Sequence, residues 1–113
     1  METYFLTITG QKHYYGLKPF TVGQTVKLVK EKDNEFDGEA IRVELPFIGT
    51  VGYVANSSYT TYIGTYSAGR LYDKIEDYAY ARVLFVTHSS AIALLVPKDL
   101  EKKEETMQEE ILF

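Results

Sequence analysis

The sequence predicts a mainly β protein, a small OB-like or SH3-like β-barrel of about six strands with one or two short helices. Short segments rich in β-branched and aromatic residues alternate apolar with polar positions, which is the period-two pattern of a half-buried strand. Glycine, proline, asparagine and aspartate separate these segments at short intervals. Because an open sheet would expose two edges, closure into a barrel is expected.

The expected strands lie at residues 2–9, 25–30, 40–45, 50–54, 78–88 and 91–96. The first alternates Leu6 and Ile8 with threonines, and the third alternates isoleucine, valine and leucine with charged residues. The last two form a hairpin turned at Ser89, and we expect it to be central because its second strand is apolar on both faces. Gly52 within the fourth strand indicates a bulge, a barrel corner or a close approach of another group to the backbone.

One helix is expected between the fourth and fifth strands. Asn56 or Ser57 would cap it, tyrosine and isoleucine follow at spacings of three and four, and Gly69 would end it. The threonine and tyrosine content of the segment favours an extended backbone instead.

The segment beyond Pro97 is expected to form a short exposed helix or a tail. Its apolar residues recur at a helix-compatible spacing: Leu100, Met107 and Ile111. Residues 98–113 carry six acids and three lysines, and the rest of the chain holds nine basic and ten acidic residues. A nearly neutral body has no general attraction for polyanions, so nucleic-acid binding would need a local site. We therefore divide the chain into a β-barrel domain over residues 1–97 and an acidic C-terminal helix or tail over residues 98–113.

The composition excludes several kinds of site. The chain has no cysteine, and therefore no disulfide or thiolate metal site. The segment from Gly49 to Gly52 lacks the Lys-Ser/Thr of a phosphate-binding loop, and the two histidines, His13 and His88, have no metal-type neighbour. We therefore expect no cofactor, no metal and no enzymatic activity.

The location of the protein is predicted from what the sequence lacks. No apolar run approaches the roughly 20 residues that a membrane span needs. The N-terminal residues do not resemble a secretion signal. We therefore expect a cytoplasmic protein that does not associate with membranes.

Aromatic and polar residues at strand ends indicate a nucleic-acid site. They are Lys12, His13 and Tyr14 after the first strand, Phe36 and Asp37 before the third, and Tyr53 at the end of the fourth. On one barrel rim, the aromatic faces would stack on bases, the lysine would neutralise a phosphate, and Gly52 would let a ligand approach the backbone. Asp37 repels phosphate and would instead accept a hydrogen bond from a sugar hydroxyl or a base amine. The same residues also fit a structural arrangement, with the tyrosines in the core or half-buried beside it and Asp37 fixing its own turn.

Three segments resemble the HIRAN domain family: Asp33–Val43, Val51–Val54 and Gly10–Gly16. The family's hallmark is Asn-x-Tyr/Phe-Asp-x-x-Ala-Ile-x-Val, then a glycine in the next strand, with an early glycine-aromatic segment before both. The similarity covers roughly residues 4–96 and is to a free-standing bacterial-type member. It implies a modified OB-like barrel with small helices and, as in the helicase members of the family, capture of the 3′ end of single-stranded DNA.

By position, the resemblance implies that Phe36 stacks on the terminal base and that Asp37 hydrogen-bonds the 3′-hydroxyl group. Further matches are Lys12 to a phosphate-contacting arginine, His13 to an aromatic beside the end nucleotide, Tyr53 to a histidine near the backbone, Phe85 to a base-stacking phenylalanine and Asn56 to a position that is basic in the helicase members. Lysine in place of arginine, histidine in place of tyrosine and the uncharged Asn56 predict weaker phosphate contact than in those relatives.

The implied partners are a single-stranded DNA end and a helicase or nuclease acting in DNA repair or processing. The alternative is a protein-interaction domain that has kept the fold without DNA binding. That domain would use the exposed tyrosines and the C-terminal helix as its contacts.

Overall fold

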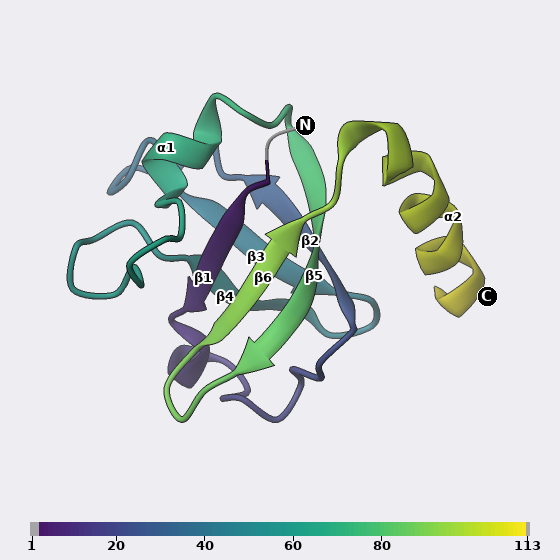
Figure 1. The fold of residues 1–113 in the computed structure, drawn as a ribbon, viewed down its shortest axis with the longest axis horizontal. Coiled ribbons are helices and arrows are strands. Elements are labelled where there is room, and N and C mark those ends of the chain that lie inside the picture. The colour runs from purple at the N-terminus through teal and green to yellow at the C-terminus, as the bar shows by residue number, and fades with distance from the viewer. Residues whose placement is uncertain (1–2, 113) are drawn as a thin grey trace.

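Six antiparallel strands close into a barrel in the order β1-β4-β3-β2-β5-β6 (Figure 1). The computed structural model describes the backbone of residues 3–112 and the side chains of residues 3–107. The strands are β1 (Phe5–Thr9), β2 (Thr25–Lys30), β3 (Ile41–Leu45), β4 (Gly49–Val54), β5 (Tyr78–Val86) and β6 (Ala91–Leu95). Every strand pairs with two neighbours, so no strand edge is left open. The predicted mainly β barrel of six strands is confirmed.

The alternation along the strands puts one face of each in the barrel core. Val26 and Leu28 in β2 are fully buried, and their neighbours along the strand are half-buried. Ile41 and Val43 in β3 are also fully buried, and charged residues occupy the half-buried positions on the outer face of that strand. A slip of one residue in register would turn these apolar side chains to the solvent, so the pattern fixes the pairing of the strands.

Gly52 lies next to a β-bulge where β4 comes close to β1. The register of β3 and β4 shifts between Val43 and Glu44, which leaves Val51 as an extra residue on β4. A Cβ atom on Gly52 would lie 2.8 Å from the Thr9 carbonyl oxygen. Strand β1 therefore fills the space beside the Gly52 backbone. The expectation that Gly52 leaves room for a ligand is wrong on this side of the strand.

The helix expected between Asn56 and Gly69 does not form. Residues 57–66 are an irregular loop, and the short helix α1 (Ala68–Tyr72) follows it. The Ser67 hydroxyl group caps this helix by accepting a hydrogen bond from a backbone amide of the first turn. Gly69, which was expected to end the helix, lies inside it.

The 57–66 loop is held by a side chain from β1. The hydroxyl group of the fully buried Thr7 accepts a hydrogen bond from the Tyr62 amide at 3.2 Å and shares one with the Thr65 hydroxyl group at 2.9 Å. These contacts span more than 50 residues of chain, so a local helical pattern could not predict them. Threonine and tyrosine favour the extended backbone that this arrangement needs.

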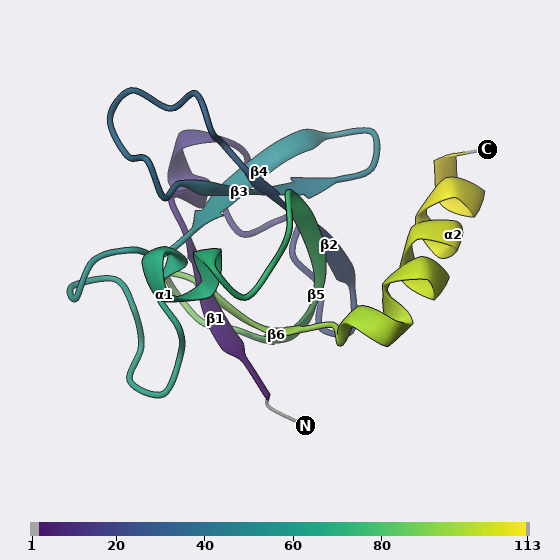
Figure 2. The same cartoon turned by 90° about the horizontal axis from the view of Figure 1, so that it is seen from above.

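The two helices lie on opposite sides of the barrel (Figures 1 and 2). Helix α2 (Glu101–Leu112) follows the 3-10 turn η2 (Lys98–Leu100) and stands beside β5. It contacts the barrel through Glu104, a buried residue that forms an ion pair with Arg82 and accepts a hydrogen bond from the Thr25 hydroxyl group at 2.8 Å. A polar contact therefore anchors the C-terminal helix.

Two of the apolar residues that predicted this helix are only about half-buried. Leu100 and Met107 remain 49% and 43% exposed, and the side chain of Ile111 lies outside the described residues. Within residues 3–112, no helix is both long and apolar enough to cross a membrane.

Candidate nucleic-acid interface

Three of the segments that the sequence singled out meet at the end of β4. The 3-10 turn η1 (Gln11–His13) follows β1, and the 31–40 loop joins β2 to β3. Tyr53, near the end of β4, pairs with Thr9 in β1 and with Arg42 in β3. Tyr53 therefore lies between the other two segments, as expected if they share one rim.

A shallow depression of about 390 Å³ adjoins Tyr53. It is lined by Asn34, Asp37, Ala40, Tyr53, Val54, Asn56, Ser57 and Thr60. The 31–40 loop and the 57–66 loop, which both contribute to this lining, extend from the same side of the barrel (Figure 2). Three predicted site residues, Asp37, Tyr53 and Asn56, therefore share one depression. Among the described residues that line it there is no lysine or arginine, so the depression offers hydrogen-bonding groups rather than a cation.

The two oxygens of the Asp37 carboxylate have different partners. Oδ1 accepts a hydrogen bond from the Glu39 amide at 2.9 Å, which closes the local turn. Oδ2 accepts one from Asn56 Nδ2 at 3.2 Å. The Asn56 side-chain oxygen in turn accepts from the Gly69 amide at 2.8 Å, which fixes the orientation of the Asn56 amide. Because each carboxylate oxygen has two lone pairs, Asp37 can accept a further hydrogen bond from a ligand in the depression.

Asn34 and Glu31 hold the 31–40 loop in shape. Asn34 Oδ1 accepts hydrogen bonds from the amides of Phe36 and Asp37, both at 2.9 Å, in an Asx turn. Asn34 Nδ2 donates to one oxygen of Glu31 at 2.9 Å, and the other oxygen accepts from the Tyr53 hydroxyl group at 2.8 Å. Sequence reasoning missed Glu31, because only the folded chain brings Asn34 and Tyr53 to the same carboxylate.

Tyr53 connects the depression to η1. Its ring lies 6.3 Å from the Tyr14 ring, measured between centroids, with the two planes tilted by 39°. Burial raises the pKa of the Tyr53 hydroxyl group, and the hydrogen bond to Glu31 and the neighbouring Tyr14 raise that pKa further. Tyr53 is therefore a protonated donor, committed to Glu31, at neutral pH.

The remaining predicted residues of this rim are open to solvent. Phe36 is 97% exposed within the 31–40 loop, so its ring contributes nothing to the core. Lys12 and His13 are exposed on η1, and Tyr14, which follows them, is 41% exposed. Tyr14 is therefore partly exposed beside Tyr53 and is not a fully buried core residue. The expectation that Asp37 fixes its own turn holds together with its place in the depression.

Phe85 lies outside this group. Two strands separate β5 from β4 in either direction around the barrel, and Phe85 does not line the depression. The turn after β5 contacts η1 through Gln11, whose side-chain amide donates to the Ser89 carbonyl oxygen. A ligand that contacted both Asp37 and the 62% exposed Phe85 would therefore have to extend well beyond the depression.

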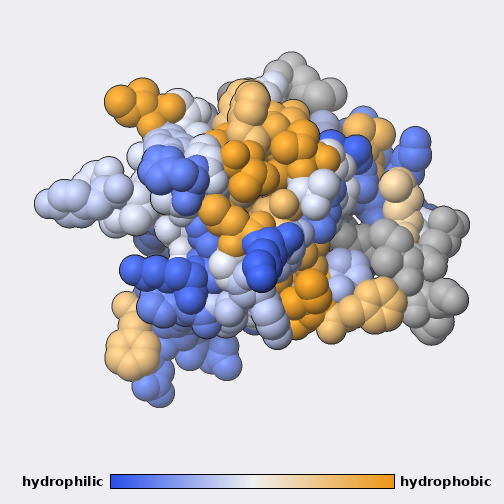
Figure 3. Space-filling model, turned by 90° about the horizontal axis from the view of Figure 1, so that it is seen from below, coloured by the Kyte–Doolittle hydropathy of each residue, from blue (hydrophilic) through white to orange (hydrophobic). Residues whose placement is uncertain are grey.

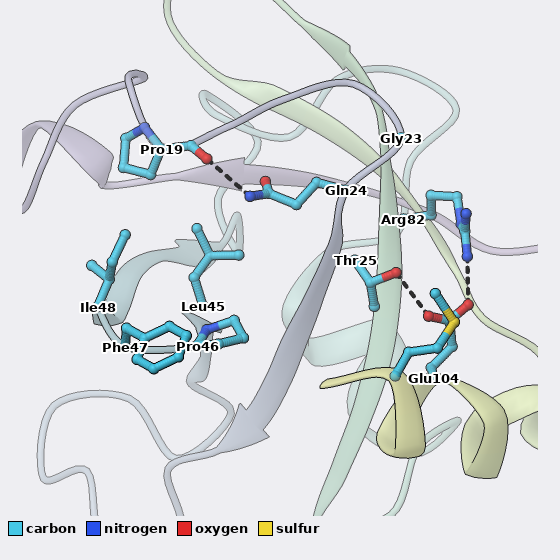
Figure 4. A pocket seen from close by; sticks show the side chains of 11 residues that line it. Pro19, Gly23, Gln24, Thr25, Leu45, Pro46, Phe47, Ile48, Arg82 and Glu104 are labelled. Atoms are coloured by element: carbon cyan, nitrogen blue, oxygen red, sulfur yellow. Dashed lines mark hydrogen bonds and ion pairs between the residues drawn. The ribbon is translucent and has the colours of Figure 1, made fainter. Parts of the chain in front are cut away.

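Exposed apolar side chains are not confined to this rim. They gather next to strongly polar ones on the face seen from below the barrel (Figure 3). A separate groove of about 390 Å³ lies between α2 and the β3–β4 turn (Figure 4). The turn lines one side with Leu45, Phe47 and Ile48, and the other side carries the ion pair of Arg82 and Glu104. None of the predicted site residues lines this groove.

Comparison with known proteins gives both a family and a fold. The model of the HIRAN domain family matches residues 1–88. A crystal structure of a protein from Lactobacillus plantarum is 21% identical with a TM-score of 0.57, covering 83% of this chain and 93% of that chain. The crystal structure of the HIRAN domain of human HLTF is 17% identical with a TM-score of 0.55, covering 98% of this chain and 89% of that chain. No curated protein matches. The two structural likenesses are to the fold alone.

Proposed function

The chain belongs to the HIRAN domain family, and from this premise we propose that it is a non-enzymatic nucleic-acid-binding module that recognises the 3′ end of single-stranded DNA. The observation that carries the proposal is the Asp37 carboxylate in a depression whose described lining has no lysine or arginine. Such a carboxylate repels a phosphate but accepts a hydrogen bond from a sugar hydroxyl group or a base amine. A free sugar hydroxyl group occurs at the end of a DNA strand, and the resemblance to the helicase members of the family favours that donor.

The other rim residues take the roles that fit their exposure. The open ring of Phe36 stacks on the terminal base, and His13 packs beside the end nucleotide. Lys12 contacts a phosphate, and Tyr53 forms the wall near the sugar-phosphate backbone. Phe85 stacks on a base further along the strand. Asn56 departs from this pattern, because it supports the site by hydrogen-bonding Asp37 instead of contacting a phosphate.

The cellular role that goes with this site is DNA repair or processing in the cytoplasm. A module without catalytic activity has to act with an enzyme that uses the captured end. We therefore propose a helicase or a nuclease as the protein partner.

Two matched oligonucleotides test the proposal. Fluorescence anisotropy would compare a 5′-labelled single strand ending in a 3′-hydroxyl group with the same strand ending in a 2′,3′-dideoxynucleotide. A hydrogen bond to a charged acceptor contributes about 1.5–3 kcal/mol, so the dideoxy strand should bind about tenfold more weakly or worse. Equal affinities for the two strands would contradict end recognition.

A second candidate function is a protein-interaction domain, which the apolar groove beside α2 favours. Phe47 in that groove is 75% exposed, and its backbone has a φ of 69°, an unfavourable conformation for a bulky residue. Both features are unfavourable for a phenylalanine in the free domain, which favours a role for its ring in contact with a partner. This candidate expects no DNA binding even at low salt. It also expects a self-association or partner contact that is lost when the chain is truncated after Pro97.

A further inference from the structure

One half-buried carboxylate joins the segments that form the candidate site. Glu31 follows the last residue of β2, and its side chain is 18% exposed. One of its oxygens accepts from Asn34 Nδ2 at 2.9 Å, and the other accepts from the Tyr53 hydroxyl group at 2.8 Å. The guanidinium of Arg42 lies 3.7 Å from the oxygen that binds Tyr53. Glu31 therefore contacts the 31–40 loop and β4 at the same time.

We propose that Glu31 is a positioning residue that fixes the Phe36–Asp37 segment relative to Tyr53. The inference rests on the proposed function, which it extends by one residue. Glu31 does not line the depression. Its effect on a ligand therefore passes through the groups it holds.

The path from Glu31 to Asp37 consists of hydrogen bonds. Glu31 holds the Asn34 side-chain amide by its nitrogen, and the oxygen of the same amide holds the backbone amides of Phe36 and Asp37 at 2.9 Å. Rotation of the Asn34 side chain would release all of these bonds together. A hydrogen bond at one end of the amide thus orients the acceptor at its other end.

Leucine at position 31 removes the contacts that Glu31 makes. Its side chain has a similar volume but no acceptor oxygen, so in Glu31→Leu both Asn34 Nδ2 and the Tyr53 hydroxyl group lose their acceptor. Glutamine is less informative, because the Tyr53 hydroxyl group can also accept a hydrogen bond from its NH₂ group. The leucine substitution separates the positioning role from simple loss of volume.

The sign of the effect separates positioning from electrostatics. Removing an acid near a polyanion site should, by charge alone, strengthen DNA binding. Loss of positioning should weaken it. Glu35→Gln is the matched control, because the exposed Glu35 carries the same charge in the same loop, next to Phe36.

Binding to the oligonucleotide with a free 3′-hydroxyl group is the first readout. Glu31→Leu should bind about fivefold more weakly than the wild type or worse, since one lost hydrogen bond already corresponds to about that ratio, and Glu35→Gln should bind equally well or more tightly. Tyr53→Phe keeps the carboxylate and removes one of its donors, so its effect and that of Glu31→Leu should be less than additive in the double variant. Equal or tighter binding by Glu31→Leu would overturn the proposal.

Backbone amide exchange is the second readout, and it needs no ligand. In Glu31→Leu the amides of Phe36 and Asp37 should exchange at least about fivefold faster, with the barrel strands unchanged, whereas Glu35→Gln should exchange like the wild type. Unchanged exchange at these amides, or faster exchange across all strands, would contradict a positioning role. If the wild type itself does not distinguish the two strand ends, the proposed function fails, and amide exchange still decides whether Glu31 positions the loop.

Discussion

Gly52→Ala tests the close approach of β4 to β1. The new Cβ atom would lie 2.8 Å from the Thr9 carbonyl oxygen and 3.2 Å from Ile8 Cγ2. Ile8 is fully buried, and both residues pair with β4, so neither atom can retreat without shifting β1. Overpacking of this kind costs about 1–3 kcal/mol, and the more restricted unfolded chain of the alanine variant offsets about 0.4–1 kcal/mol. The expected net loss of about 1–2 kcal/mol lowers the Tm by roughly 4–8 °C in a domain of this size.

Thermal unfolding followed by circular dichroism measures this loss, with two glycines as controls. A Cβ atom on Gly38 meets open space, so Gly38→Ala should melt at or slightly above the wild-type Tm. A Cβ atom on Gly69 meets only the flexible side chain of Glu39, and alanine is favoured inside α1, so Gly69→Ala should also keep the wild-type Tm. A wild-type Tm for Gly52→Ala would refute the packing argument. A wild-type Tm with lost DNA binding would instead assign Gly52 to a ligand.

Three other predictions concern the rim and the C-terminal helix. Phe36→Ala should leave the Tm unchanged, because the ring is exposed. The same variant should bind a single strand about fivefold more weakly or worse, since base stacking contributes about 1–3 kcal/mol. Phe36→Tyr should restore the affinity in the same anisotropy assay. Affinity should fall only slowly with salt between roughly 50 and 200 mM, with a log-log slope of about −0.7 to −1, because Lys12 is the one cation assigned to phosphate. A slope steeper than about −2 would indicate that other cations contact the DNA. Glu104→Gln should loosen α2, because it removes the ion pair with Arg82, while the hydrogen bond from the Tyr78 hydroxyl group to Glu105 remains. The cost should be about 1 kcal/mol or less, because Arg82 is partly exposed. Faster amide exchange over residues 102–107 would detect the loosening, and unchanged exchange there would show that the ion pair does not anchor the helix.

The strands could be predicted because their signal is local. Val26 and Leu28, or Ile41 and Val43, alternate with polar neighbours over five or six residues, and the barrel buries those positions. The 57–66 loop could not be predicted in this way. Its backbone bonds to Thr7, a residue more than 50 positions away, and such a contact overrides the spacing of aromatic residues that indicated a helix.

The candidate site was predictable in part for the same reason. Asp37 and Tyr53 were singled out because they lie at strand ends, next to Phe36 and Gly52, and they do share a depression with Asn56. Glu31 gave no such signal, because an acid after a strand is ordinary. Its importance comes from two donors that only the fold brings together.

The most direct test of the central claim measures strand-end discrimination in Asp37→Asn. Asparagine can keep the acceptor for the Glu39 amide, but it presents an NH₂ group where Oδ2 accepts from Asn56, so the turn is kept and the second acceptor is lost. The measured quantity is the ratio of Kd values for the dideoxy strand and the 3′-hydroxyl strand. The wild type should give a ratio of about ten or more, and Asp37→Asn a ratio near one. A ratio that stays the same in the variant would show that Asp37 does not read the hydroxyl group.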